Sequence, residues 1–230
     1  MKNVIAIVQA RMGASRLPNK MMLHLHGYSM IEWVFQRASR ARNIDTLVFA
    51  LPETPQDDVL ALHLTKLGAN VFRGSEDDVL QRFYFAAKAY EASYVVRICA
   101  DNPFISPGEI DNLVKFYFTT PCDYAYNNVP NGNRYPDGFG AEIVSFPLLE
   151  RLHHEAHSQN QREHIFNFIW ENRENLTIRT FDPPDTEIAF PDIKLDIDTY
   201  EDYYRLLEAE VSPQMDDRQI VNLFRSPLRG

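Results

Sequence analysis

The sequence predicts an α/β fold with a mostly parallel central sheet, helices on both faces and a small inserted subregion. Over the first 120 residues, short apolar runs alternate with stretches of helical periodicity. The segments between these runs are long enough for right-handed helical crossovers, which join parallel strands. In addition, Arg11, Arg16 and Lys20 crowd the loop after the first apolar run, and ligands of such folds bind at the carboxyl ends of the strands.

The expected elements follow from apolar runs, helical spacing and capping residues. Strands are expected at residues 4–8, 46–51, 70–72, 94–98, 177–181 and 193–197, and helices at residues 29–42, 56–67, 77–90, 107–117, 146–157, 162–174 and 199–209. Gly68 is typical of a helix end, whereas Ser75 and Thr199 are typical of helix starts. Turn signals interrupt residues 121–145. We therefore expect a single domain over residues 1–230, with an inserted acceptor-binding or dimerisation subregion at about 121–190.

Composition limits the class of protein. The formal net charge is -9, and the chain has two cysteines, Cys99 and Cys122, which lie far apart. This supports neither a disulfide framework nor a zinc pattern, and it favours a reducing, cytoplasmic location. No apolar run approaches the roughly 18 residues of a membrane span. The acidic balance also argues against nucleic-acid binding, so we expect a protein that binds neither membrane nor nucleic acid.

The loop at residues 9–20, QARMGASRLPNK, predicts an anion site, because no acidic residue precedes Glu32. Gly13 lets backbone N–H groups face a phosphate. Arg offers bidentate contacts to phosphate oxygens, and Lys offers a point charge. The spacing excludes both a Walker P-loop and a dinucleotide fingerprint. We interpret the loop as a cradle for a triphosphate, and we expect Arg73 and Asp101 to lie at the same edge of the sheet.

The motifs resemble those of the cytidylyltransferases that make CMP-activated acid sugars, such as acylneuraminate and 3-deoxy-manno-octulosonate cytidylyltransferases. The spore coat polysaccharide biosynthesis branch, typified by SpsF, is the most similar. Five motifs follow the basic loop in the same order: FRGSEDDVL at 72–80, RICADNP at 97–103, YPDG at 135–138, REH at 162–164 and DIDT at 196–199. Together the motifs span nearly the whole chain.

The resemblance implies a nucleotide-diphosphosugar transferase fold of the Rossmann-like GT-A kind. It also implies a Mg²⁺-dependent enzyme that transfers CMP from CTP to a sugar acid, of the nonulosonate or octulosonate type, and releases pyrophosphate. The process would be surface polysaccharide biosynthesis. Because the resembling enzymes are commonly dimers, we expect a homodimer.

The resemblance implies roles only for those residues of this chain that match the family motifs. The implied catalytic residues are Arg11, Arg16, Lys20 and Asp101, and the implied metal ligands are Asp101 and Asp198, with Asp196 as a rival. The implied nucleotide contacts are Gln9, Ala10, Arg11, Met12, Gly13, Ser15, Arg16, Lys20, Arg73, Ser75 and Asp77. The implied acceptor contacts are Tyr135, Asp137, Glu142, Arg162 and His164. Two Asp at strand ends also fit the one or two carboxylates that Mg²⁺ takes in proteins.

The chain departs from the family pattern at two places: Leu51-Pro52-Glu53 replaces the commoner Thr-Asp-type segment, and Ala100 stands where Gly is more usual. Three alternatives stay open at this point. The enzyme could use another acceptor, such as a phosphonate or a sugar phosphate, or it could use another nucleoside triphosphate. The chain could also be a non-catalytic, nucleotide-binding scaffold protein.

Overall fold

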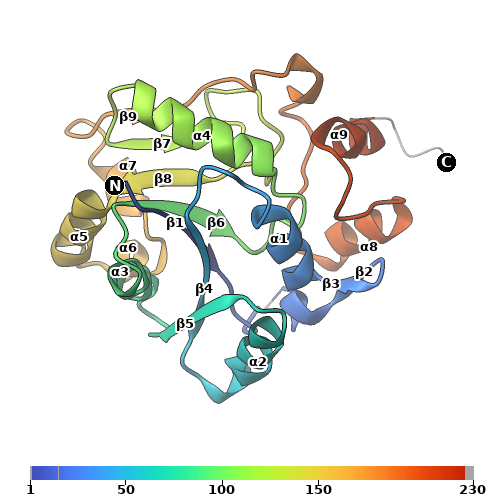
Figure 1. The fold of residues 1–230 in the computed structure, drawn as a ribbon, viewed down its shortest axis with the longest axis horizontal. Coiled ribbons are helices and arrows are strands. Elements are labelled where there is room, and N and C mark those ends of the chain that lie inside the picture. Colours follow the sequence, from blue (N-terminus) through green and yellow to red (C-terminus); the bar gives the residue numbers. More distant parts are fainter. Residues whose placement is uncertain (1, 15, 226–230) are drawn as a thin grey trace.

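The computed structural model describes residues 2–14 and 16–225, and a seven-stranded sheet runs through its centre (Figure 1). The strand order is β5 (Asn70–Gly74), β4 (Thr46–Pro52), β1 (Val4–Gln9), β6 (Tyr94–Cys99), β8 (Glu142–Ser145), β7 (Tyr124–Tyr126) and β9 (Ile178–Arg179). Strands β5, β4, β1 and β6 are parallel, β8 is antiparallel to both β6 and β7, and β9 is parallel to β7. The mostly parallel α/β sheet is confirmed.

Helices cover both faces of the sheet because its central strands are apolar on both sides. In β1, Val4, Ala6 and Val8 pack into one core cluster, whereas Ile5 and Ile7 pack into another. This is the alternation expected of a strand buried on both faces. Helices α1 (Met30–Ala38), α2 (Asp58–Lys66) and α4 (Pro107–Thr119) contribute to the first cluster, and α3 (Val79–Ala89), α5 (Phe146–Glu155) and α7 (Asn167–Glu171) to the second.

A third core cluster joins the two ends of the chain. It lies among the short hairpin β2 (His24–Leu25) and β3 (Tyr28–Ser29), α8 (Tyr200–Glu208) and α9 (Asp217–Arg225), which appear together on the right of Figure 1. The buried Arg37 of α1 donates to Ile105 O over 2.8 Å and to Asp217 Oδ1 over 3.0 Å. The C-terminal helices are therefore docked on N-terminal residues.

Three local expectations were wrong. The helix expected at 162–174 is divided into α6 (Gln159–Glu163) and α7, because Ile165 and Phe166 between them are buried in the second core cluster. Residues 193–197 form only one isolated bridge, between Asp137 and Lys194. Their backbone hydrogen bonds go instead to loop residues such as Asp137 and Asp101. The N-cap of α3 is Asp78 and not Ser75, whose hydroxyl accepts from the Asp78 N–H over 3.1 Å.

The described chain has three further features. Gly140 lies so close to the backbone that a Cβ atom there would come within 2.2 Å of Asn127 O. Among the helices in the described part of the chain, none is long and apolar enough to cross a membrane. Both cysteines are free thiols.

Candidate active site

The basic loop begins at the carboxyl edge of the sheet, where β1 ends at Gln9 between β4 and β6. The Met12 N–H donates to Asp57 Oδ1 over 2.7 Å, and the Thr54 hydroxyl donates to Asp57 Oδ2 over 2.6 Å. Asp57 is buried in η2 (Pro55–Asp57), after β4. A single buried carboxylate therefore ties the basic loop to the loop after the neighbouring strand.

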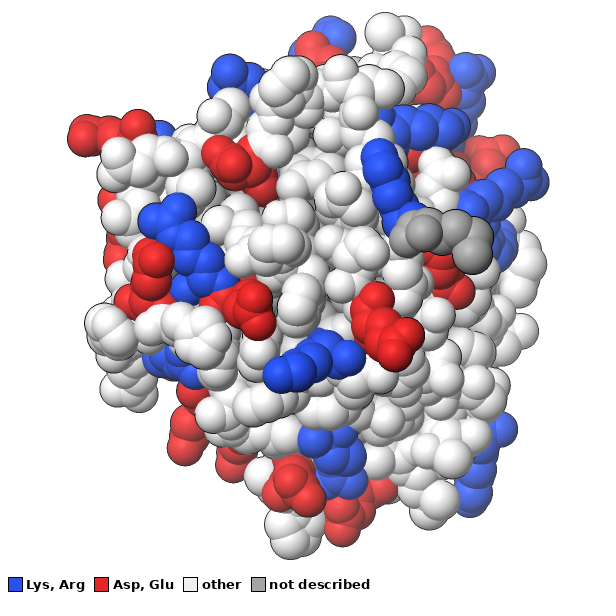
Figure 2. All heavy atoms as spheres, turned by 60° about the vertical axis from the view of Figure 1, so that its left-hand side comes forward, with Lys and Arg blue, Asp and Glu red and all other residues white. Residues whose placement is uncertain are grey.

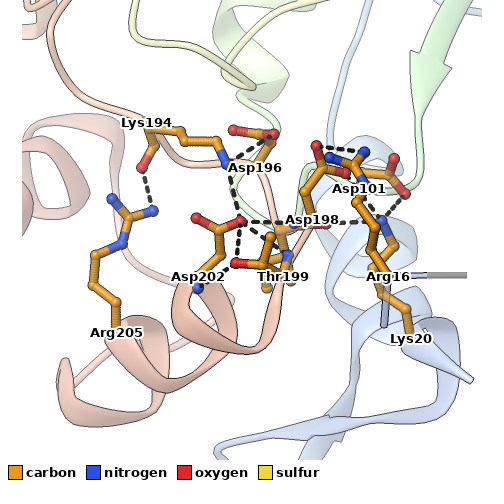
Figure 3. A network of polar contacts seen from close by, with 10 residues as sticks. Arg16, Lys20, Asp101, Lys194, Asp196, Asp198, Thr199, Asp202 and Arg205 are labelled. Carbon is orange, nitrogen blue, oxygen red and sulfur yellow. Dashed lines mark hydrogen bonds and ion pairs between the residues drawn. The ribbon is translucent and has the colours of Figure 1, made fainter. Parts of the chain in front are cut away.

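Lys20 gathers two carboxylates at this edge (Figure 3). Its Nζ lies 2.9 Å from Asp101 Oδ1 and 3.5 Å from Asp198 Oδ1, and it donates to Ile197 O over 2.8 Å. Only 7% of the Lys20 side chain is exposed. Arg16 Nη2 lies 3.0 Å from Asp198 Oδ2, but 66% of the Arg16 side chain is exposed. Asp101 and Asp198, which lie far apart in the sequence, are thus brought together.

Asp198 is positioned by the start of α8. Asp202 accepts hydrogen bonds from the N–H groups of Asp198 and Thr199, each over 3.0 Å, and from Lys194 Nζ over 2.9 Å. Thr199 and Asp202 form a capping box, so Thr199 is confirmed as the N-cap. Burial alone would raise the pKa of Asp202, but the hydrogen bonds from Lys194, Asp198 and Thr199 outweigh it and lower the pKa to about 2.

Asp196 lies in the segment at 193–197, two residues before Asp198. Its carboxylate contacts Lys194 at 3.7 Å, and Figure 3 shows it apart from the group formed by Lys20, Asp101 and Asp198. Burial, together with the nearby Asp137, raises the pKa of Asp196 to about 6. The contacts therefore favour Asp198 over Asp196 as the partner of Asp101.

A pocket of about 300 Å³ opens at these residues. Its lining includes four permanent cations (Arg11, Arg16, Lys20 and Arg97) and two carboxylates (Asp101 and Asp198), and it also includes Gln9, Ala10, Gly13, Ala14, Leu17, Met21, Cys99, Ala100 and His164. The lining is thus net positive in a chain whose formal charge is -9. On the side of the molecule in Figure 2, by contrast, Lys and Arg are interspersed with Asp and Glu. The excess of positive charge is local, as an anionic substrate requires.

Some expected nucleotide contacts lie outside the pocket lining. Arg73 donates to Pro52 O over 2.7 Å and Thr54 O over 2.8 Å, and it pairs with Asp58. The exposed Asp77 lies in the loop before α3 together with Ser75. A nucleotide role for Arg73, Ser75 and Asp77 stays a prediction, and Ser15 lies outside the described residues.

Of the five expected acceptor contacts, only His164 lines the pocket. Tyr135 is buried, and its hydroxyl donates to Glu109. Asp137 is bridged to Lys194 through the backbone. Arg162 pairs with Asp78 at the start of α3, with Nε 2.9 Å from each carboxylate oxygen.

Glu142 lies behind the pocket, where it pairs with the pocket-lining Arg97. The sequence interpretation missed Arg97 as well as Asp57. A signal for Arg97 was present, because it is the only charged residue within the apolar strand YVVRIC at 94–99. Asp57 carried no such signal, since Thr54 and Asp57 also read as an ordinary helix start.

Comparisons with known proteins agree with this geometry. The cytidylyltransferase family profile matches residues 5–220. The chain is 32% identical over 208 residues to the spore coat polysaccharide biosynthesis protein SpsF of Bacillus subtilis, covering 88% of this chain and 84% of SpsF. It is 31% identical over 125 residues to a 3-deoxy-manno-octulosonate cytidylyltransferase of Chlorobium luteolum, covering 54% of this chain and 48% of that enzyme.

A solved structure supports the same relationship. The structure of a cytidylyltransferase from Leptospira borgpetersenii is similar over 100% of both chains, with a TM-score of 0.88 and 26% identity. The expected Rossmann-like fold is therefore confirmed over the full length. From the family match, the relatives and this fold, we conclude that the chain belongs to the cytidylyltransferase family and is a nucleotidyltransferase.

Proposed function

We propose that this cytidylyltransferase transfers CMP from CTP to a sugar acid, requires Mg²⁺ and releases pyrophosphate. The observation that carries the proposal is the pair Asp101 and Asp198, gathered on Lys20 beside a net positive pocket. The similarity to a 3-deoxy-manno-octulosonate cytidylyltransferase supports an octulosonate acceptor, and the resemblance of the motifs to those of acylneuraminate cytidylyltransferases extends the proposal to a nonulosonate. The similarity to SpsF supports a role in surface polysaccharide biosynthesis.

The donor set fits Mg²⁺. Within residues 2–14 and 16–225, no group of three or more His, Cys, Asp or Glu side chains is arranged as a metal centre. Asp101 and Asp198, which meet at Lys20 in the pocket lining, would hold the ion, and phosphate oxygens and water would supply the other ligands that Mg²⁺ prefers. When bound, Mg²⁺ would offset the negative charge of the phosphates.

The cations of the basic loop suit the triphosphate. Arg11 is partly exposed, and its contact with Glu163 at 4.0 Å is long. Arg16 is bound to Asp198 but largely exposed. Both side chains can therefore turn to the phosphates at little cost, whereas Lys20 is fixed and holds the two carboxylates in place.

In this arrangement the reaction is an in-line displacement at the α-phosphorus of CTP. The acceptor hydroxyl oxygen forms a bond to the α-phosphorus and releases its proton to water, and the bond to the bridging oxygen of the β-phosphate breaks, so that pyrophosphate leaves. Arg11 and Arg16 stabilise the charge that develops on the departing pyrophosphate, and Lys20 acts through the two carboxylates that it holds. Catalysis of this kind consists mostly of positioning and charge neutralisation.

The first test measures pyrophosphate release with Mg²⁺, CTP and a panel of acceptors. The panel contains 3-deoxy-manno-octulosonate, neuraminate, legionaminate, pseudaminate and simple phosphonates, and ATP, GTP and UTP serve as donor controls. We expect release with CTP and a sugar acid only. Release only with a phosphonate, or equally with all four nucleotides, would refute the proposed substrates while leaving nucleotidyl transfer in place.

The second test changes the site itself. Arg16→Ala and Asp101→Ala should each lower kcat/KM at least about a hundredfold, because one charge contact in a transition state contributes about 3 kcal/mol. Melting temperatures should stay near the wild-type value, since both side chains are partly exposed. Arg151→Ala is a matched control, because Arg151 pairs with Glu155 on the surface of α5. Wild-type turnover in Arg16→Ala or Asp101→Ala would contradict the assignment.

We also propose a homodimer, to which the subregion at 121–190 contributes. Light scattering after size-exclusion chromatography tests this directly, and a single peak at the monomer mass of 26.7 kDa would refute it.

A further inference from the structure

Arg97 is a charged residue in the middle of the sheet. It lies in β6, next to Ile7 of β1 on one side and to Glu142 of β8 on the other. Its side chain is only 19% exposed, and it lines the pocket together with Gln9, Cys99 and His164. A guanidinium withdrawn from water to this extent is unfavourable unless negative groups meet it. The hydrogen-bond partners of Arg97 therefore indicate which part of the guanidinium is available to a ligand.

Two buried side chains hold Arg97 from behind. Its Nη1 donates to Glu142 Oε2, and the Tyr124 hydroxyl donates to Glu142 Oε1 over 2.5 Å. Both carboxylate oxygens of Glu142 are thus engaged, and Glu142 itself is buried. Burial alone would lower the pKa of Arg97, but Cys99 and Glu142 raise it above its ordinary value, so the guanidinium stays charged. Glu142 and Tyr124 therefore fix Arg97 and do not face the substrate themselves.

The other edge of the guanidinium is incompletely bonded. Nη2 has a long contact of 3.4 Å with Gln9 Oε1, and Nε is buried without a hydrogen-bond partner. A guanidinium edge with two parallel N–H groups is the geometry that binds a planar carboxylate through both oxygens. Gln9 is the first side chain that such a ligand would displace, and Gln9 lines the pocket as well.

We propose that Arg97 binds the carboxylate of the acceptor, and that Glu142 and Tyr124 position it for this role. The inference rests on the proposed sugar-acid acceptor. Two observations distinguish the acceptor from the triphosphate as the ligand of Arg97. The three cations Arg11, Arg16 and Lys20 belong to the basic loop, and the acids that they contact are partly exposed, whereas Glu142 behind Arg97 is buried. Because Glu142 balances Arg97, this part of the pocket suits a single negative charge and not a polyanion.

The test compares an acid with its neutral analogue. The probes are 3-deoxy-manno-octulosonate and its C1 carboxamide, with neuraminate and its carboxamide as a second pair, all at saturating CTP and Mg²⁺. The key variant is Arg97→Lys, which keeps the charge opposite Glu142, and hence the fold, but removes the two-N–H edge. Arg97→Gln removes the charge as well, and Arg151→Lys is the surface control.

We expect Arg97→Lys to raise the acceptor KM at least tenfold and Arg97→Gln about a hundredfold, with the KM for CTP changed less than threefold. The preference for acid over carboxamide should fall by the same factors. Glu142→Gln should raise the acceptor KM by a smaller factor at unchanged CTP affinity, which a general loss of structure would not do. Calorimetric titration with CTP and the melting temperature report on folding in each variant.

Three results would overturn the inference. In the first, Arg97→Lys keeps the acceptor KM and the acid preference of the wild type. In the second, the KM for CTP rises instead, which would assign Arg97 to the phosphates. In the third, the wild-type enzyme is active only with acceptors that lack a carboxylate. Only the third result also refutes the proposed sugar-acid acceptor, so the two proposals fail separately.

Discussion

Replacing Asp202 by Asn should destabilise the enzyme in a pH-dependent manner. Asp202 accepts hydrogen bonds from Lys194 Nζ and from the backbone N–H groups of Asp198 and Thr199, and its side chain is only 13% exposed. These contacts lower its pKa from 3.8 to about 2, which corresponds to about 2.5 kcal/mol of folding free energy. Loss of a capping carboxylate alone typically costs about 1 kcal/mol, so the ion pair with Lys194 supplies much of the rest.

The sign of the pH dependence follows from the direction of this shift. Because the pKa of Asp202 is lower in the folded chain, its contribution is complete above about pH 4 and is lost as the pH falls towards 2. At pH 7 we expect Asp202→Asn to lower the free energy of unfolding by about 2 kcal/mol, and the melting temperature by roughly 4–8 °C. At pH 3 about half of this difference should remain, and the variant and the wild type should converge only below about pH 2.

Urea unfolding at pH 7 and at pH 3 measures this difference, which should be about half as large at pH 3. Asp192→Asn is the control, because Asp192 is an exposed acid a few residues before the same helix. A difference below about 0.5 kcal/mol at pH 7, or one that is independent of pH, would show that the contacts of Asp202 do not stabilise the folded chain. Activity should also fall, because a neutral amide holds the Asp198 backbone N–H less tightly than the carboxylate does.

Two further predictions concern the frame of the site. Gly140→Ala should prevent folding or lower the free energy of unfolding by more than about 3 kcal/mol, because its Cβ would lie 2.2 Å from Asn127 O. Soluble yield and thermal unfolding measure this effect, and wild-type stability would contradict the prediction. Asp57→Ala should raise the KM for CTP about tenfold, because the Met12 N–H loses the buried carboxylate that holds the basic loop. An unchanged KM for CTP would show that the loop is held by other contacts.

The N-terminal half of the fold was predictable because its strands are short, apolar and buried on both faces. Residues such as Val4–Val8 leave few alternatives to a central strand. The C-terminal half was less predictable because tertiary contacts decide its local structure. Ile193, Leu195 and Ile197 alternate like a strand, but they pack into the third core cluster, and their backbone partners lie in loops. Likewise, Ile165 and Phe166 interrupt a helical pattern because the core buries them.

The site was predictable where charge stood out against its surroundings. Arg11, Arg16, Lys20, Asp101 and Asp198 all line one pocket, as the family motifs implied. The sequence could not indicate which partner a buried charged side chain contacts in the folded chain. Glu142 follows the YPDG motif closely, which predicts an acceptor contact, but in the folded chain it is buried and binds Arg97.

Lys20 and Ile197 are bonded although they are 177 positions apart, and Arg37 and Asp217 are bonded 180 positions apart. The pocket therefore cannot be completed before the C-terminal segment has emerged from the ribosome and docked. Closing so long a loop is slow compared with forming the neighbouring contacts of β1 and β4. The parallel strands can thus pair in a nascent chain whose pocket is still incomplete. On refolding, the return of secondary structure should precede the return of enzymatic activity. The rate at which activity returns should therefore measure the docking of the segment that contains Ile197 and Asp217.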